Sequence, residues 1–202
     1  MSDFPKRANV VIIGQGGIVG SCVAHHLIER GWEDIVGIDK SSIPTDVGST
    51  AHASDFCYAT AHDHMTCYTT MYSIDFYEKM GRYAKVGGLE VCRLDDDERW
   101  EELKRKVGSG KAFGTNACLI DAKETKEKFP LLEEDVIRGA LWDPDAGLVT
   151  PRSQTVVGDL VEQAEQTGKL KAFANTSATG LDIKDGHICG VETSRGYIET
   201  ST

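Results

Sequence analysis

The sequence predicts an α/β fold built around a parallel β-sheet. A continuous apolar, β-branched run, ANVVIIG, is typical of a strand that is buried on both faces. A glycine cluster, GQGGIVG, follows it, and then a helical pattern that ends at Gly31. A second apolar run, DIVGIDK, closes on Asp39. Because two strands joined by a helix normally form a right-handed parallel crossover, residues 8–40 are expected to begin a Rossmann-type domain.

The middle of the chain is expected to be α+β. From about Asp63 to Met80 apolar residues recur every three or four positions, which predicts a helix. Its aromatic stripe of Tyr68, Tyr72 and Phe76 is interpreted as core. Further on, GGLEVCRL is expected to be a strand and DDDERWEELKRKVGSG a charged helix. ACLIDAKETKEKFP contains a capping box, and VIRGALWDPDAG is expected to be a strand and a turn.

The C-terminal part predicts a helix followed by a β-meander. TPRSQTVVGDLVEQAEQTG places Thr150 at the N-cap, Pro151 at the first helical position and Gly168 just past the end. The meander strands are expected in LKAFA, ATGLDIK and HICGVET, with Asp185-Gly186 as a hairpin turn. The chain stops soon after a further strand, so it is expected to be a truncated product of a longer protein. The predicted domains are 1–50 with 150–202, of Rossmann type, and 51–149, a partial substrate-side region.

Composition narrows the range of partners and locations. The formal net charge of −10 argues against a nucleic-acid partner, because phosphate binding needs a basic face. No apolar run reaches about 18 residues, so no membrane span is expected. The N-terminus shows no targeting leader, which predicts an intracellular, cytoplasmic location and leaves a mitochondrial one open. The oligomeric state stays open.

The glycine cluster is typical of a turn that binds a dinucleotide pyrophosphate. The fingerprint G-x-G-x-x-G allows a tight turn, a close pyrophosphate and close helix–strand packing. Here the cluster is off by one residue: counting from Gly14 puts the third position on Val19, and counting back from Gly20 puts the first on Gln15. Asp39 closes the next strand, where its carboxylate can accept hydrogen bonds from ribose hydroxyls. The pattern suits NAD and FAD alike; the long loop after Asp39 favours FAD.

A histidine in the following loop, GSTAHASDF, has several possible roles. His52 could be a satisfied loop residue, a metal ligand, a general base or an attachment point for a cofactor. The residues around it are small, which would let an imidazole ring lie close to a ligand. The pattern by itself leaves these alternatives open.

Several segments together resemble one enzyme family. VVIIGQGGIVG, RGWEDIVGIDK, GSTAHAS, VGGLEV and DPDAGLVTPRSQTV are similar to the N-terminal part of FAD-dependent oxidoreductases of the D-amino acid oxidase-like group. Within that group the chain resembles dimethylglycine oxidases and dehydrogenases and sarcosine dehydrogenases. The resemblance implies an FAD-binding Rossmann-type domain and the oxidation of secondary or tertiary N-methyl amino acids.

The resemblance also implies which residues contact FAD. His52 matches the histidine that carries the flavin covalently in those enzymes. The full set of implied contacts is Gly14, Gly16, Gly17, Ile18, Val19, Gly20, Asp39, Lys40, Ser49, Thr50, Ala51, His52, Phe56 and Ala178. The family's catalytic residues lie in a C-terminal half that this sequence lacks, so none is assigned.

Other candidate sites and functions are weaker. His62 and His64 flank Asp63 at the expected start of a helix, so no metal site is predicted. His25 and His26 are interpreted as surface or packing residues. The expected partner is a small-molecule amine substrate. The alternatives are a nicotinamide dehydrogenase of the same fold and a non-catalytic remnant.

Overall fold

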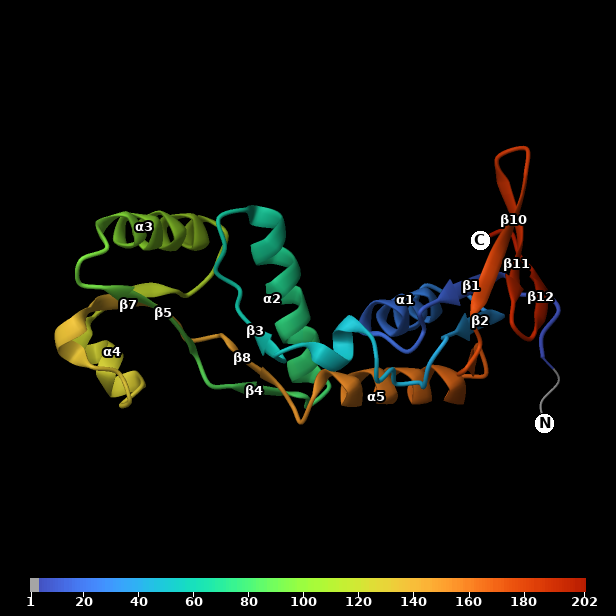
Figure 1. The fold of residues 1–202 in the computed structure, drawn as a ribbon, viewed down its shortest axis with the longest axis horizontal. Helices are drawn as coiled ribbons and strands as arrows, with labels where there is room; N and C mark the ends of the chain where they lie inside the picture. The colour runs from blue at the N-terminus through green and yellow to red at the C-terminus, as the bar shows by residue number, and fades with distance from the viewer. Residues whose placement is uncertain (1–3) are drawn as a thin grey trace. The chain divides into compact units, whose positions relative to one another are not determined.

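A computed structural model describes residues 4–202 (Figure 1). The chain divides into two compact units. The first unit comprises the residues up to Ser54 together with Pro151–Thr202, and the second unit is Asp55–Thr150. Within residues 4–202, no helix combines the length and the apolar character that crossing a membrane requires.

The first unit is built on a three-stranded parallel sheet. The strands β1 (Val10–Ile13), β2 (Ile35–Ile38) and β9 (Leu170–Phe173) lie in the order β1-β2-β9. The helix α1 (Ile18–Glu29) joins β1 to β2, which confirms the predicted crossover. All four residues of β2 are buried, as a central strand covered on both faces should be.

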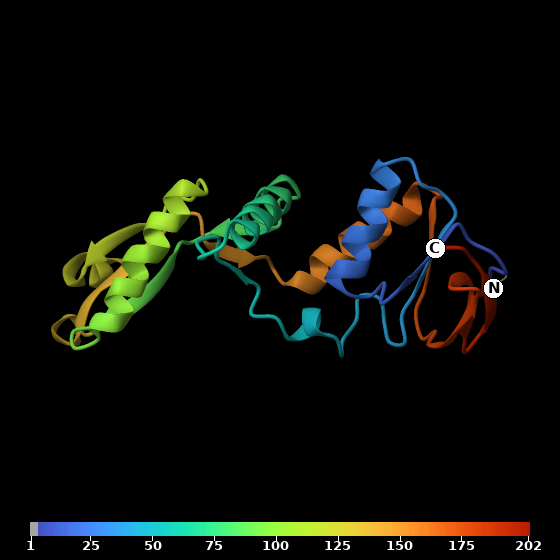
Figure 2. The same cartoon turned by 90° about the horizontal axis from the view of Figure 1, so that it is seen from above.

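One face of this sheet is covered by helices and the other by a meander. The helix α5 (Ser153–Gln166) packs beside α1, as both views show (Figures 1 and 2). The opposite face carries the antiparallel strands β10 (Ala178–Lys184), β11 (His187–Thr193) and β12 (Gly196–Glu199). The helix-side core comprises Val10, Ile12, Ala24, Ile35, Val157, Val161, Ala164 and Leu170. The meander-side core comprises Ala8, Val36, Ile38, Phe173, Val191 and Ile198.

Two predictions for this unit are wrong. The segment LKAFA is not part of the meander, because β9 pairs in parallel with β2, from Leu170 opposite Ile35 to Phe173 opposite Ile38. Strand propensity cannot reveal a partner so far away in sequence. The helix α5 begins at Ser153 with Arg152 at the N-cap, two residues later than the Thr-Pro signal predicts. The hairpin turn is confirmed by the positive φ of Asp185 and Gly186, 50° and 79°.

The second unit contains two antiparallel sheets with three helices. One sheet has the order β3-β8-β4 and the other β5-β7-β6. The strands are β3 (Phe56–Cys57), β4 (Tyr83–Lys85), β5 (Gly88–Arg93), β6 (Cys118–Asp121), β7 (Ile137–Asp143) and β8 (Gly147–Val149). The helices are α2 (His64–Lys79), α3 (Asp97–Ala112) and α4 (Ala122–Lys128), with short 3-10 turns at Ser49–His52 (η1, first unit) and Glu134–Val136 (η2).

Caps and packing define the helices of the second unit. Asp63 accepts a hydrogen bond from Thr66 N and caps α2, and Asp121 with Glu124 forms the predicted capping box of α4. The helix α3 buries Leu103 and Val107 in a cluster with Cys92, Ala117 and Leu141.

The predicted core role of the aromatic stripe on α2 is wrong for two of its residues. Tyr68 and Tyr72 are 57% and 50% exposed. The face that is buried instead carries Cys67 and Ile74. The helical period was right, but the period does not say which face of the helix finds a partner.

Candidate functional site

The turn between β1 and α1 requires glycine at two points. Gly14 has a φ of +97°, which glycine adopts without strain, and the backbone N–H groups of Gly14 and Gln15 both donate to Ile38 O. A Cβ on Gly20 would lie 2.3 Å from Gly14 O, so the first turn of α1 rests directly on the backbone of the turn. No acidic residue lies in the first turn of α1, so the N–H groups and helix dipole there favour an anion.

Asp39 ties the end of β2 to the glycine turn. Its Oδ2 accepts a hydrogen bond of 2.9 Å from Gly16 N, and its Oδ1 accepts one of 2.9 Å from Ser41 N. A Cβ on Gly16 would lie 2.9 Å from Asp39 Oδ2, so glycine allows this approach. Each carboxylate oxygen keeps a second lone pair, and Asp39 can therefore still accept a hydrogen bond from a ligand hydroxyl.

The loop that carries His52 is attached to both helices of the first unit. Thr50 Oγ1 accepts a hydrogen bond of 3.0 Å from Ile18 N at the start of α1. From the start of α5, Arg152 donates to Ala51 O at 3.2 Å and Gln154 donates to Thr45 O at 3.1 Å. These contacts hold the 3-10 turn η1, whose last residue is the exposed His52.

A cavity of about 390 Å³ opens between these segments, within the size range of small-molecule sites. Seven predicted residues line it: Gly14, Gly17, Asp39, Lys40, Ser49, Thr50 and Ala178. Ala178 reaches the cavity because Thr176 N donates to Asp39 O at 2.7 Å, which brings the start of β10 to the end of β2. The cavity therefore gathers residues from four separate segments of the chain.

The other seven predicted residues lie outside the cavity wall. Gly16, Ile18, Val19 and Gly20 belong to the turn and to α1 without lining the cavity. Ala51 and His52 follow the lining residues Ser49 and Thr50 within η1. Phe56 begins β3 in the second unit. The FAD contacts of all fourteen residues stay predictions.

Sequence reasoning missed several residues of this region. The cavity is also lined by Ile13, Ile38, Thr45, Val47, Gly48, Thr176 and Ser177. Thr45 N donates to Gly16 O at 2.8 Å, so the loop after Asp39 returns to the glycine turn. For Thr45, Val47 and Gly48, only the abundance of Ser, Thr and Gly in residues 41–60 could have pointed to the site, and that composition is common to many loops.

Gln15 is a further residue whose environment could not be foreseen. Its side chain is fully buried, and neither Nε2 nor Oε1 has a hydrogen-bond partner. The amide occupies the space over Gly37 of β2, where a Cβ would lie 2.5 Å from Gln15 Cγ. The glutamine at the ambiguous position of the fingerprint is thus accommodated by a glycine on the neighbouring strand.

Comparison with known proteins identifies the chain's relatives. A family model described as DAO, FAD dependent oxidoreductase, matches residues 9–201. The mitochondrial pyruvate dehydrogenase phosphatase regulatory subunit of Mus musculus is 31% identical over 97% of this chain and 22% of that protein. The mitochondrial sarcosine dehydrogenase of Homo sapiens is 27% identical over 98% of this chain and 22% of that protein. The chain thus spans less than a quarter of these relatives' length.

Solved structures show the same fold. The L-proline dehydrogenase of P. horikoshii has a TM-score of 0.89 and 30% identity, and the match covers 98% of this chain and 52% of that one. The L-amino acid deaminase of Proteus myxofaciens has a TM-score of 0.84 and 22% identity, and the match covers 100% of this chain and 46% of that one. The α/β fold predicted from the sequence is confirmed.

The glycine turn, the acid at the end of β2 and the cavity between them occur in a chain that the family model matches over nearly its whole length. The chain therefore belongs to the DAO family of FAD-dependent oxidoreductases.

Proposed function

We propose that this chain is the FAD-binding portion of an enzyme that oxidises secondary or tertiary N-methyl amino acids similar to dimethylglycine or sarcosine. The observation that carries the proposal is the cavity of the first unit, where the glycine turn, Asp39 and η1 converge. The names of the relatives support the substrate class, since they include sarcosine and dimethylglycine dehydrogenases.

The residues present fit an FAD. Gly14 and Gly17 line the cavity without a side chain, and a Cβ on Gly14 would meet only open space. A pyrophosphate can therefore approach the turn and the positive end of the α1 dipole. Asp39 would accept hydrogen bonds from the ribose, and Lys40 would add positive charge near the phosphates. The bound flavin would supply the redox chemistry, accepting two electrons from the C–N unit of the substrate.

We further propose that His52 is a covalent tether for the flavin. A ring nitrogen of His52 would bond to the 8α-methyl carbon of the flavin, and the imidazole and the methyl group would each lose one proton. The two electrons released would reduce the flavin, which dioxygen could then reoxidise. His52 is exposed and stands two residues beyond Thr50, which lines the cavity. The hydrogen bond from Arg152 to Ala51 O fixes the peptide just before it.

Acid precipitation tests both parts of this proposal. Protein expressed with FAD is expected to be yellow, and its acid pellet to keep the flavin fluorescence. His52→Ala should leave flavin in the supernatant, whereas His187→Ala, an exposed histidine on β11, should behave as wild type. Flavin that washes out of the wild type contradicts the tether alone, and colourless protein contradicts FAD binding.

A regulatory role is the second candidate function. The relative that is 31% identical is named a regulatory subunit, which favours a chain that binds flavin without substrate turnover. Anaerobic bleaching of the flavin by sarcosine or dimethylglycine separates the two functions, because only the oxidase role predicts it. Several relatives carry mitochondrial names, so a mitochondrial location is proposed.

A further inference from the structure

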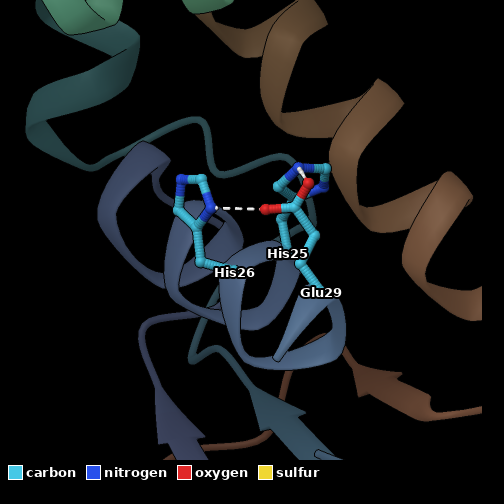
Figure 3. Close-up of side chains that lie close together, drawn as sticks. All are labelled: His25, His26 and Glu29. Atoms are coloured by element: carbon cyan, nitrogen blue, oxygen red, sulfur yellow. Dashed lines mark hydrogen bonds and ion pairs between the residues drawn. The ribbon is translucent and has the colours of Figure 1, made fainter. Parts of the chain in front are cut away.

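The C-terminal end of α1 carries two histidines and a glutamate that face one another (Figure 3). One ligand atom from each of His25, His26 and Glu29 lies within 4.8 Å of the other two. Among residues 4–202, no other group of three such side chains comes this close. The carboxylate lies between the rings: His26 Nδ1 is 2.8 Å from Oε2 and His25 Nε2 is 3.5 Å from Oε1.

Helix geometry brings these three side chains together. Glu29 follows His25 by four residues and His26 by three, and both spacings place side chains on neighbouring positions of one helix face. The two rings, with centroids 5.1 Å apart at 76°, flank the carboxylate. The side chains of His25, His26 and Glu29 are 22%, 31% and 58% exposed, so an ion can reach the three groups from solvent.

We propose that His25, His26 and Glu29 form a binding site for a divalent transition-metal ion such as Zn²⁺. Two imidazole nitrogens, one carboxylate oxygen and a water molecule make up a typical four-coordinate zinc site. Metal–nitrogen distances of about 2.0–2.1 Å require ligand atoms roughly 3.3 Å apart, which small rotations of the two imidazole rings and of the Glu29 side chain would provide. On each histidine, the ring nitrogen that faces Glu29 would bind the metal in place of its contact with the carboxylate. A proton on that nitrogen would pass to solvent or to the other ring nitrogen.

The main alternative is an ion pair at the end of the helix. Histidine cations are favoured there by the helix dipole, and the hydrogen bond from His26 lowers the pKa of Glu29. The two roles differ in selectivity. Two imidazoles and one carboxylate favour Zn²⁺, Ni²⁺ or Cu²⁺ over Mg²⁺, because Mg²⁺ prefers oxygen ligands. An ion pair alone has no such preference.

The proposed metal site is separate from the cofactor cavity. The cavity is lined near the beginning of α1 by Gly14 and Gly17, whereas His25 lies two helical turns further on. A rise of about 1.5 Å per residue puts His25 roughly 10 Å from the start of the helix. Metal binding can therefore be measured whether or not flavin is present, and it would brace the last turn of α1 against fraying.

Calorimetric titration of the whole chain with Zn²⁺ tests the proposal. One site per chain is expected, with no comparable binding of Mg²⁺. The double variant His25→Ala/His26→Ala should lose at least tenfold in affinity, and Glu29→Gln should lose less because it removes the negative charge and keeps the amide oxygen. His62→Ala and His187→Ala are matched controls, since neither residue belongs to the cluster, and both should bind as wild type.

Six free cysteines make a spectroscopic readout necessary. Co²⁺ in place of Zn²⁺ should show d–d bands without a thiolate charge-transfer band, because nitrogen and oxygen are the proposed ligands. Circular dichroism should be used to check that each variant is folded. Two outcomes would overturn the proposal. One is an unchanged Zn²⁺ affinity of the folded double variant, and the other is a cobalt spectrum that consists only of a thiolate band and is the same in the double variant.

Discussion

In the first unit, close backbone approaches at glycine hold the turn beside the cavity, whereas in the second unit they join neighbouring strands: Cβ atoms on Gly139 and Gly147 would lie 2.3 Å from Ile120 O and Ala84 O. A Cβ on Gly20 would lie 2.3 Å from Gly14 O, and one on Gly37 would lie 2.5 Å from the buried Gln15 side chain. In the second unit Glu90 pairs with both Arg99 and Lys106. Added volume at these glycines should therefore disturb the turn in the first unit and the pairing of strands in the second.

The two arrangements suit different tasks. A pyrophosphate binds backbone N–H groups that no side chain covers. Glycines in the turn leave these groups accessible and also let the helix pack closely against the strand. The second unit has short antiparallel sheets and an apolar cluster, and ion pairs such as Glu90–Arg99 lie at its partly exposed surface. Each such pair is worth little by itself, since exposed pairs contribute about 0–1 kcal/mol.

The largest effect is expected from Gly20→Ala. The added methyl group meets backbone atoms of Gly14 that cannot move away like a flexible side chain, so α1 must shift from the turn. We expect a loss of about 1–3 kcal/mol in the free energy of unfolding and at least tenfold weaker FAD binding. Chemical denaturation and flavin titration measure the two effects.

Gly108→Ala is the matched control in the second unit. Gly108 lies on the exposed side of α3, where a Cβ would meet nothing within 4 Å. Alanine should stabilise this helix by about 0.5–1 kcal/mol. Equal effects of the two substitutions would show that the close approach of Gly14 O does not restrict the side chain at position 20.

A smaller effect is expected from the contact between Gln15 and Gly37. Gly37→Ala should destabilise the wild type, because Gln15 Cγ and Oε1 would each lie 2.5 Å from the new methyl group. In a Gln15→Ala background the same change should be almost neutral. Denaturation of both single variants and the double variant should give a coupling free energy of about 1–2 kcal/mol. Additive effects would show that the two residues do not compete for the same space.

The smallest effect concerns acid sensitivity in the second unit. A hydrogen bond from Asn116, and then one from Lys85, lower the pKa of Asp145. A folded-state pKa below the unfolded value means that this stabilisation is present above the unfolded pKa of about 3.9 and is lost as the pH falls through the folded value. Asn116→Ala should therefore reduce the free energy of unfolding at pH 7 by about 0.5–1 kcal/mol and flatten its decline in acid.

NMR titration of the Asp145 carboxyl checks this directly. Its pKa should rise in Asn116→Ala and keep its wild-type value in Gly108→Ala. A wild-type acid profile in Asn116→Ala would show that the hydrogen bond of 2.6 Å does not contribute to stability.

Local signals account for the elements that could be predicted. The β-branched runs, the cap residues Asp63 and Asp121 and the Asp185-Gly186 turn act within a few residues of themselves, and the structure contains each of them. The glycine turn and Asp39 were recognisable for the same reason, because spacing along one βα unit determines where they lie. Of the seven predicted residues that line the cavity, Gly14, Gly17 and Asp39 followed from these local elements, and Lys40, Ser49, Thr50 and Ala178 followed from the resemblance to the family.

The sequence by itself determined the crossover of the first unit, the acid at the end of β2 and the kinship with flavoproteins, since the first two depend on residues close together in the chain and the third on several short motifs, each local. Only the tertiary structure decided which strand pairs with β2, which face of α2 stays exposed and what surrounds Gln15. Those outcomes depend on contacts between residues far apart in sequence, and propensity and period carry no information about such partners.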